Sequence, residues 1–379
     1  MAPKIAFVID ELEVGGSQRQ LYLVATGLTR RGWQVHLICL QPILAMADDF
    51  KAAGIPVHLL QKRRKLDVRL VAALSRFFVD NQINLVHLTS STAEFFGGLA
   101  TRLCRIPSVT SVRTANTALP LSHRLGKRLA CRLASAVVAN SRAGARIVIA
   151  AGLVAADKVC VIPNGVSLHH QSAFRDETRQ RLGIPADALV VLSVGRLVWE
   201  KGYELTLALA QRASAWPRAP LFLIAGDGPL RDALTQQIRA AHLVEHVRLL
   251  GERRDVPDLL AVADVYLNTS VSEGLSNSIM EAMAAAVPVL AAAAGGTPEL
   301  IVDGETGLLF PPGDLTTAAL KLGRLSGDPD LRSRLGQQAR RRVETVFSYD
   351  TMISQFEGLY RSVLEASARH AAFPVANGL

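Results

Sequence analysis

The stretch Leu189–Gly202, LVVLSVGRLVWEKG, joins a continuous apolar run to a loop that carries two cations. An uninterrupted Val/Leu run predicts a strand buried on both faces, as in parallel sheets covered by helices. In such sheets ligands bind at the carboxyl ends of the strands. Gly195 ends this strand, so Arg196 and Lys201 follow at the position where a ligand is expected, and an arginine fork with a lysine suits a diphosphate. The alternative is an ion pair of Arg196 with Glu200 or with another surface acid.

Similar apolar runs alternate with helix-period segments along the whole chain, which indicates two doubly wound α/β domains of the Rossmann-like kind. The predicted strands are Ile5–Ile9, Val35–Leu40, Val57–Leu60, Leu85–Leu88, Val109–Val112, Ala136–Ala139, Val159–Ile162, Leu189–Val194, Leu221–Ala225, Val247–Leu250, Val265–Asn268, Val287–Ala291 and Leu308–Phe310. A length of 379 residues also favours two domains. Pro163-Asn164-Gly165 marks the join, so we expect one domain over 1–165 and the other over 166–350.

The charge of the chain is unevenly distributed between these halves. The net charge is +9, and the chain is 49% hydrophobic and 20% charged. Residues 1–165 hold 21 Lys and Arg against 9 Asp and Glu, a balance of +12, and residues 166–379 hold 21 against 24, a balance of −3. The first half therefore favours an anionic partner.

Two basic clusters could meet that partner, Lys62–Lys65 and the segment 124–132. In the second, Arg124, Lys127, Arg128 and Arg132 lie beside an apolar stripe of Leu125, Leu129 and Leu133. A basic amphipathic helix of this kind either packs on its own sheet with its charges in water or contacts an anionic membrane surface. Nucleic acid is disfavoured because aromatic residues are few, at 5%, and no recognition motif is present.

The remaining composition predicts a cytoplasmic protein that is at most peripheral on the cell membrane. The four cysteines are scattered and form no CxxC pair, as expected in a reducing compartment. No apolar run reaches the roughly 18–20 residues of a membrane span, and the first residues resemble a strand more than a signal peptide. No metal site is predicted: Asp328-Pro329-Asp330 precedes a helix that Asp can cap, and the His242/His246 pair lacks further ligands.

The segment Glu273–Glu281, EGLSNSIME, places two carboxylates eight positions apart after the strand Val265–Asn268. If a helix starts near 276–278, the amides of Leu275, Ser276, Asn277 and Ser278, close to Gly274, lie at its N-terminus and can bind phosphate. Glu273 and Glu281 could then accept hydrogen bonds from hydroxyl groups on either side of a bound diphosphate. A capped surface helix is the alternative, but a nucleotide sugar has the matching order of polyol, diphosphate, ribose and base.

Gly15-Gly16 follows the first strand and precedes a helix, so it allows the backbone to approach a ligand there. The pattern is neither GxGxxG nor a Walker A loop, so it supports neither a dinucleotide nor an ATP site. A plain structural turn is the alternative.

Taken together, these motifs resemble a family 4 retaining glycosyltransferase with the two-domain GT-B architecture. The resemblance covers nearly the whole chain and rests on the order of Gly15-Gly16, ANSRAG (139–144), VIPNGV (161–166), VGRLVWEKG (194–202), AGDGPLRDAL (225–234), LLGERRDVPDLLAVADV (249–265), E-x7-E and GGTPELIVDGETGLLF (295–310).

The resemblance implies roles for individual residues. Arg196 and Lys201, next to Gly195, would contact the donor phosphates, Glu273 the donor sugar and Glu281 the ribose. The segments Gly226–Gly228 and Gly251–Asp255, the latter including Arg253, would surround the base. A last helix at about 351–366 would cross back onto the first domain.

The chain departs from the family pattern at three positions. SVRTAN has Arg113 where many relatives carry a histidine, and an arginine cannot act as a general base. Arg113 and Asn140 are therefore candidates for acceptor binding or an electrostatic role, and a structural ion pair is the alternative for Arg113. Ser167 and Ala286 replace a common Asp and Gly.

We therefore expect a metal-independent retaining hexosyltransferase that needs no cofactor and moves a sugar from a nucleoside diphosphate to a hydroxyl. The acceptor would be a lipid-linked or polysaccharide-precursor glycan. A phosphorylase or nucleotide-sugar epimerase on the same scaffold, or a non-catalytic nucleotide-sugar-binding protein, remains as an alternative.

Overall fold

The computed structural model describes residues 2–13, 15–64, 66–112, 121–167 and 175–372, without the side chains of 121–125 and 370–372. The chain divides into two compact units. One is formed by Met1–Gly165 together with Tyr349–Leu379, and the other by Val166–Ser348. We treat each unit by itself.

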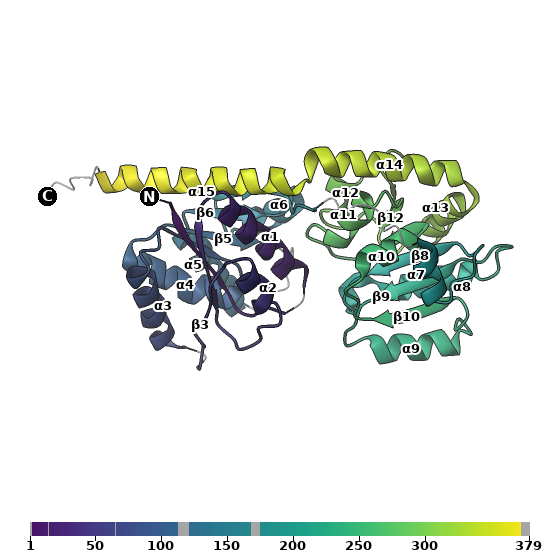
Figure 1. The fold of residues 1–379 in the computed structure, drawn as a ribbon, viewed down its shortest axis with the longest axis horizontal. Coiled ribbons are helices and arrows are strands. Elements are labelled where there is room, and N and C mark those ends of the chain that lie inside the picture. The colour runs from purple at the N-terminus through teal and green to yellow at the C-terminus, as the bar shows by residue number, and fades with distance from the viewer. Residues whose placement is uncertain (1, 14, 65, 113–120, 168–174, 373–379) are drawn as a thin grey trace. The chain divides into compact units, whose positions relative to one another are not determined.

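The first unit contains a seven-stranded parallel sheet in the order β3-β2-β1-β4-β5-β6-β7. Figure 1 labels β3, β5 and β6 of this sheet. Its strands are β1 (Lys4–Ile9), β2 (Gln34–Cys39), β3 (Val57–Leu59), β4 (Leu85–Leu88), β5 (Ser108–Val112), β6 (Ala136–Ala139) and β7 (Val159–Val161). Alternate residues of β1 enter different cores, since Phe7 packs in one cluster and Val8 in another. Burial of both faces explains why these strands are apolar throughout.

Helices cover this sheet and lead from one strand to the next. They are α1 (Gly16–Arg30), α2 (Ala47–Ala52), α3 (Val68–Asp80), α4 (Ser91–Cys104), α5 (Leu121–Leu133) and α6 (Arg142–Ala150), with the short 3-10 turn η1 (Ala156–Lys158) before β7.

The C-terminal helix α15 (Tyr349–Ala372) also belongs to the first unit, where it packs against α1. It adds Phe356 and Tyr360 to the core cluster that contains Phe7. The Tyr360 hydroxyl and His87 Nδ1 lie 2.6 Å apart, and both side chains are buried. The helix extends beyond the expected segment at about 351–366 at both ends, although its contacts with the core end at Val363 and Leu364.

The second unit contains a six-stranded parallel sheet in the order β10-β9-β8-β11-β12-β13. The strands are β8 (Val190–Val194), β9 (Leu221–Ala225), β10 (Val247–Gly251), β11 (Val265–Asn268), β12 (Val289–Ala292) and β13 (Leu308–Phe310). The helical segments are α7 (Arg175–Arg181), η2 (Trp199–Lys201), α8 (Tyr203–Ala213), α9 (Arg231–Ala240), α10 (Val256–Val262), α11 (Asn277–Ala284), α12 (Thr297–Leu300), α13 (Leu315–Gly327) and α14 (Pro329–Val346).

Two parallel, doubly wound sheets confirm the predicted fold class. The strand order reverses direction between β1 and β4 in the first unit and between β8 and β11 in the second. A doubly wound sheet binds ligands at such a switch point, where loops diverge above the carboxyl ends of neighbouring strands. The β8/β11 junction is therefore where the second unit is expected to hold a ligand.

Several strands begin or end one residue from their predicted bounds, and two further predictions differ from the structure. The strand expected over Val287–Ala291 begins at Val289, since Pro288 has no N–H to contribute to the ladder. In α5, Lys127 is not part of a solvated face: it pairs with the buried Glu94 and donates to the Ser111 carbonyl at 3.1 Å. Leu129 of the predicted apolar stripe is instead 40% exposed.

Candidate functional site

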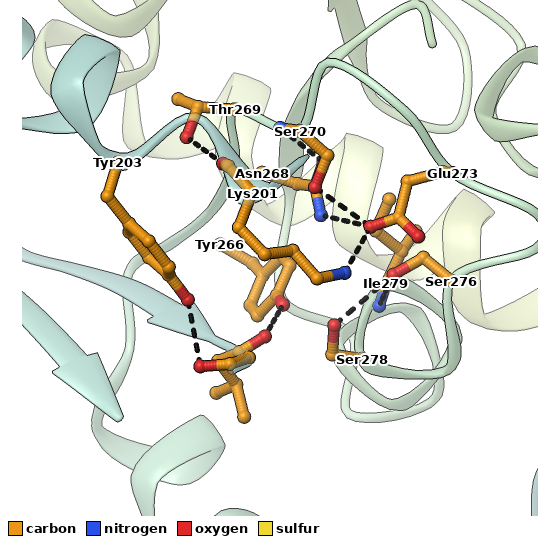
Figure 2. Close-up of polar contacts among 12 residues, drawn as sticks. Lys201, Tyr203, Tyr266, Asn268, Thr269, Ser270, Glu273, Ser276, Ser278 and Ile279 are labelled. Atoms are coloured by element: carbon orange, nitrogen blue, oxygen red, sulfur yellow. Dashed lines mark hydrogen bonds and ion pairs between the residues drawn. The ribbon is translucent and has the colours of Figure 1, made fainter. Parts of the chain in front are cut away.

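The carboxyl end of β8 is fixed by two buried tyrosines. Tyr266 donates to the Val194 carbonyl at 3.2 Å, and Tyr203 donates to the Gly195 carbonyl at 2.9 Å (Figure 2). Burial raises the pKa of both phenols well above their ordinary value, and the nearby Glu273 adds to the shift at Tyr203. Both hydroxyls therefore stay protonated and act as donors that hold the start of the loop bearing Arg196.

Lys201 and Glu273 form an ion pair across the β8/β11 junction. Lys201 Nζ lies 2.5 Å from Glu273 Oε1, and both side chains are largely buried. The same oxygen accepts from the Ser270 hydroxyl at 2.8 Å and faces the Asn268 amide at 3.5 Å (Figure 2). Lys201 and Glu273 are far apart in sequence, and they meet because β8 and β11 are hydrogen-bonded neighbours.

The contacts of Lys201, Ser270 and Asn268 are all made to Oε1 of Glu273, so its second carboxylate oxygen, Oε2, is unused. Within the described ranges, no residue donates to Oε2. Lys201 Nζ has three N–H groups and contacts only Glu273 among those residues. The pair can thus offer an acceptor oxygen and ammonium donors to the same bound molecule.

The loop of Glu273 is held by close backbone packing against Gly295. A Cβ atom at Gly295, whose φ is +53°, would lie 1.8 Å from the Glu273 carbonyl oxygen. The backbone of the β8 loop is supported in the same way, because a Cβ at Gly226 would lie 1.9 Å from the Gly195 carbonyl oxygen. Only glycine fits at either position.

The helix α11 starts where the sequence predicts, at Asn277, with Ser276 as its N-cap. The Ser276 hydroxyl accepts from the Ile279 amide at 3.4 Å and lies 3.2 Å from the Ser278 hydroxyl. Glu281 is half-buried one turn inside the helix, and its charge contributes to the raised pKa of Tyr266. Gly274 and the buried Leu275 complete the link from Glu273 to the helix.

Arg196 is exposed in the loop after β8. The alternative ion pair with Glu200 is not formed, and the Arg196 guanidinium has no protein partner in the part of the chain that the structure describes. This guanidinium, in the same loop as Lys201, is available for an anionic ligand.

The two other glycine-rich segments take different places at this edge. Gly228 packs against the backbone of Leu197, and the Leu197 amide donates to the Asp227 carbonyl at 2.9 Å. This turn therefore supports the loop that carries Arg196. Arg253, after β10, donates two hydrogen bonds to Asp255, from Nε to Oδ1 at 2.8 Å and from Nη2 to Oδ2 at 2.6 Å. This carboxylate raises the pKa of the Arg253 guanidinium.

The remaining predicted residues belong to the first unit. Gly15 is the N-cap of α1, and Gly16 is its first residue. Asn140 is buried directly after β6: its backbone amide donates to the Val112 carbonyl at 3.4 Å, and its Oδ1 has no hydrogen-bond partner among the described residues. Arg113 lies outside the described residues.

Four residues of this site are absent from the sequence prediction: Tyr203, Tyr266, Asn268 and Ser270. The last two could have been found, because the polar run Asn268-Thr269-Ser270 follows the apolar strand Val265–Leu267 directly. The tyrosines carry no such signal, since one lies on a helix and the other within a buried strand.

No group of three or more His, Cys, Asp or Glu side chains that could hold a metal ion occurs among the described residues. Asp328 of the Asp-Pro-Asp stretch caps α14 by accepting the Leu331 amide at 2.8 Å, as expected for a helix start. No helix within the described ranges has the length and apolar character of a membrane span.

Comparison with known families identifies both halves of the chain. Residues 14–170 match the model described as Glycosyltransferase Family 4, and residues 174–342 match that of Glycosyl transferases group 1. An alpha-D-kanosaminyltransferase of Streptomyces kanamyceticus is 33% identical over 193 residues, an alignment that spans 50% of each chain. The chain therefore matches only about half the length of that relative.

Other relatives are similar over more of their length. A D-inositol 3-phosphate glycosyltransferase of Streptomyces scabiei is 30% identical over 76% of this chain and 70% of its own. The crystal structure of Anabaena HepE in complex with UDP and glucose has a TM-score of 0.86 at 26% identity, covering 95% of this chain and 100% of HepE. The chain belongs to the family 4 glycosyltransferases and has their GT-B fold.

Proposed function

We propose that the protein transfers a hexose from a nucleoside-diphosphate sugar to an acceptor hydroxyl, with retention at the anomeric carbon and without a metal ion. The observation that carries the proposal is the Lys201–Glu273 pair at the β8/β11 switch point. It presents an unused carboxylate oxygen and spare ammonium donors, and Arg196, which has no partner among the described residues, is exposed in the same loop as Lys201. HepE, which is 26% identical, was solved with UDP and glucose, so a uridine donor is the first to test.

Lys201 and Arg196 would bind the diphosphate. The Lys201 ammonium can keep its bond to Glu273 with one N–H and direct the others at phosphate oxygens. Arg196 adds a planar fork, and the N-terminal amides of α11 provide further positive potential. These charges would stabilise the negative charge that develops on the departing diphosphate, the role a metal ion has in other transferases.

Glu273 would position the sugar through Oε2. Its Oε1 is already held by Lys201, Ser270 and Asn268, so the free oxygen is oriented before a ligand arrives. A sugar hydroxyl that donates to it would gain a charge-assisted hydrogen bond. Because the carboxylate is engaged with a cation, we assign it to binding rather than to nucleophilic attack.

Glu281 would accept hydrogen bonds from the ribose hydroxyls. The nucleotide base would lie next to the segments that contain Gly226, Gly228 and Arg253. Gly15 and Gly16 would allow a close backbone approach from the first unit. We further propose that the diphosphate takes the proton of the acceptor hydroxyl on the same face as the attack. This step needs no general base from the protein, and none of the described site residues is assigned that role.

The acceptor, a lipid-linked or polysaccharide-precursor glycan, would bind to the first unit. The buried Asn140 has an acceptor oxygen without a partner in the described part of the chain, at the carboxyl edge of β6, and Arg113 follows β5 in the sequence. We place the protein in the cytoplasm, where its four free cysteines would remain reduced.

The first measurement is thermal stabilisation by UDP, GDP, ADP and their common sugars, with and without EDTA. We expect one nucleotide to raise the melting temperature, EDTA to leave the shift unchanged, and Glu281→Ala to abolish it. A shift that requires a divalent cation would contradict metal independence, and a shift that survives in the variant would contradict the ribose assignment.

Turnover with that donor then tests whether Arg196 and Lys201 stabilise the departing diphosphate. Arg196→Ala or Lys201→Ala should lower kcat by ~10²-fold or more, as for loss of a charge-stabilising donor. Arg340→Ala is the control, since Arg340 pairs with Glu344 on the exposed face of α14. Near-normal kcat in both site variants would refute the assignment.

A further inference from the structure

The loop that follows β8 exposes a tryptophan. Trp199 is 63% exposed, whereas Trp33 is 3% exposed and Trp216 packs against the core of the second unit. Val271, in the loop after β11, is 42% exposed. A solitary exposed apolar side chain is common on proteins, so the case for a ligand rests on what surrounds this indole.

The backbone that carries Trp199 is fixed. Trp199 opens the 3-10 turn η2, and Gly202, whose φ is +62°, closes it by donating to the Trp199 carbonyl at 3.0 Å. A Cβ atom at Gly202 would lie 2.4 Å from the Thr269 carbonyl oxygen, so glycine allows the two loops to approach each other. The Val271 amide donates to the Glu200 carbonyl at 2.9 Å. Trp199 and Val271 therefore stand on loops whose backbones are hydrogen-bonded to each other.

The same two loops carry the proposed donor site. Lys201 is the last residue of η2, and Glu273 follows Val271 by two residues. The Thr269 hydroxyl donates to the Lys201 carbonyl at 3.0 Å, and the Lys201 ammonium pairs with Glu273 (Figure 2). The first and third residues of a 3-10 turn are separated by a rise of about 4 Å. The backbone of Trp199 therefore lies at the border of the donor site.

The acids near Trp199 in the sequence are not neutralised by the protein. Glu200 is partly buried and Glu204 is exposed in the first turn of α8, and neither forms an ion pair with a described residue. Ser272, which follows Val271, is exposed. The border of the donor site thus offers an aromatic ring together with carboxylates and a hydroxyl, which accept hydrogen bonds.

We propose that Trp199 binds an uncharged sugar ring of the acceptor. A face of a pyranose ring that carries C–H groups presents weakly positive hydrogens, which suit the negative face of an indole. Hydroxyls at the edge of the same ring would donate to Glu200 and Glu204, and hydrogen bonds to carboxylates are stronger than those to neutral groups. Val271 would extend the apolar contact.

The charge of this border selects against other ligands. Arg196 and Lys201 are assigned to the diphosphate, so a phosphate or carboxylate on the bound ring would face Glu200 and Glu204 without a cation, and like charges oppose binding. A lipid chain would cover these acids without supplying hydrogen-bond donors. A hydroxyl-rich, uncharged ring satisfies both the indole and the acids.

This inference rests on the proposed function and refines it. The second unit would contribute an acceptor contact in addition to those proposed for the first unit. Trp199 would bind and orient the acceptor and take no part in bond formation. Its loss should therefore weaken acceptor binding and leave donor binding unchanged.

The first test is the intrinsic fluorescence of the full-length protein, with and without the nucleotide that stabilises it. The methyl glycosides of glucose, galactose, mannose and N-acetylglucosamine are titrated in turn. We expect at least one of them to change the emission of the wild-type protein, because a sugar on an exposed indole displaces water. Trp199→Phe should abolish this change, although Trp33 and Trp216 remain.

Affinity for the same sugar is measured by ligand-observed NMR. Trp199→Ala should weaken binding about tenfold, because the stacking contact and its buried area are lost, and Trp199→Phe about threefold, because a smaller aromatic face remains. With this sugar as acceptor, Trp199→Ala should raise KM by a similar factor and leave kcat within about twofold, as for a contact made equally in the ground and transition states.

The 6-phosphate of the same sugar tests the role of charge. It should bind the wild-type protein at least ~10-fold more weakly than the uncharged sugar, and Glu200→Gln/Glu204→Gln should reduce the difference. Equal binding of the two sugars by the wild-type protein would contradict the assignment of an uncharged ring.

Two control variants lie in the same unit. Trp216→Phe removes an indole that packs against the core, and it should retain the sugar-induced change of emission. Val244, after α9, is 57% exposed, and Val244→Ser removes an exposed apolar side chain that has no role in the proposal. The thermal shift with nucleotide, measured on every variant, should equal that of the wild type and verifies that each variant is folded.

Three results would overturn the proposal. The first is that none of the four sugars changes the emission of the wild-type protein or binds to it by NMR. The second is wild-type affinity in Trp199→Ala, and the third is a change of emission that persists in Trp199→Phe. A nucleotide shift without sugar binding would contradict this inference alone, whereas the absence of any nucleotide shift would contradict the proposed function.

Discussion

At the scale of single residues, the pairing of charges decides which groups can meet a ligand. Glu273 has one oxygen fixed by Lys201 and Ser270, and its other oxygen is left for a hydroxyl. Arg253 is bound to Asp255, whereas Arg196 has no carboxylate partner among the described residues. The same residue type thus has a structural role at one loop and is available for binding at the other.

A second pair of side chains, His36 on β2 and His58 on β3, predicts a pH dependence of stability. Their ring nitrogens lie 3.4 Å apart at the sheet edge. Burial lowers the pKa of both, and at His36 the facing His58 and Lys4 lower it further. Since the folded pKa lies below the unfolded value, this contribution to stability is present above about pH 6.5 and is lost as the pH falls toward the folded pKa.

The prediction is tested by the melting temperature as a function of pH. Between about pH 7.5 and 5.5 the wild-type protein should lose stability, and His58→Gln should lose less because one imidazole no longer has to remain neutral. His246→Gln removes an imidazole from the second unit and serves as the control. Parallel pH curves for wild type and His58→Gln would contradict the role of the pair.

At the scale of elements, α15 completes a core that the first 165 residues begin. Its buried face supplies Met352, Ile353, Phe356 and Tyr360 to the cluster that contains Phe7. The Tyr360 hydroxyl reaches His87, whose other ring nitrogen lies 2.6 Å from the Ser111 hydroxyl. A segment from the end of the chain is thus joined to two central strands by packing and by a buried polar chain.

The helix offers a matched pair of tyrosines to test this. Tyr360→Phe should lower the free energy of unfolding by about 1–3 kcal/mol, because a buried hydrogen bond to His87 is lost. Tyr349→Phe should be neutral, since the buried Tyr349 hydroxyl has no hydrogen-bond partner within the described ranges. Chemical denaturation of both variants provides the comparison, and equal effects would show that the hydrogen bond between Tyr360 and His87 adds no net stability.

At the scale of the whole molecule, the predicted donor contacts are concentrated in one unit. Arg196, Lys201, Glu273 and Glu281 all belong to residues Val166–Ser348. The ends of that unit are joined to each other, because the Val166 amide donates to the Phe347 carbonyl at 3.0 Å and Val166 forms a bridge with Ser348. A unit with its own core and adjacent ends meets the conditions for independent folding.

We therefore predict that residues 166–348 alone fold and bind the donor nucleotide within about tenfold of the affinity of the full chain. They should not transfer the sugar, since the acceptor contacts proposed for Asn140 and Arg113 lie in the first unit. Calorimetric titration and a transfer assay measure the two properties. An unfolded fragment, or one that does not bind the nucleotide, would mean that the first unit is required for the donor site.

Much of the fold could be predicted from the sequence, because local pattern and strand burial coincide in parallel sheets. The strands Leu85–Leu88, Ala136–Ala139, Leu221–Ala225 and Val265–Asn268 have the predicted bounds. The helix start at Asn277 also follows from the N-cap Ser276. Each of these features is set by neighbours in the chain: apolar runs for the strands, and a hydroxyl that satisfies an unpaired amide for the helix.

The sequence by itself determined the two doubly wound sheets, the positions of the loops at their carboxyl edges and the candidate residues on those loops. Only the tertiary structure decided how side chains distant in the chain pair. It joins Lys201 to Glu273, turns Lys127 inward to Glu94, and leaves Leu66 and Val68 exposed. The physical reason is that periodicity reports burial along one element, whereas a partner is chosen by which strands and helices lie side by side.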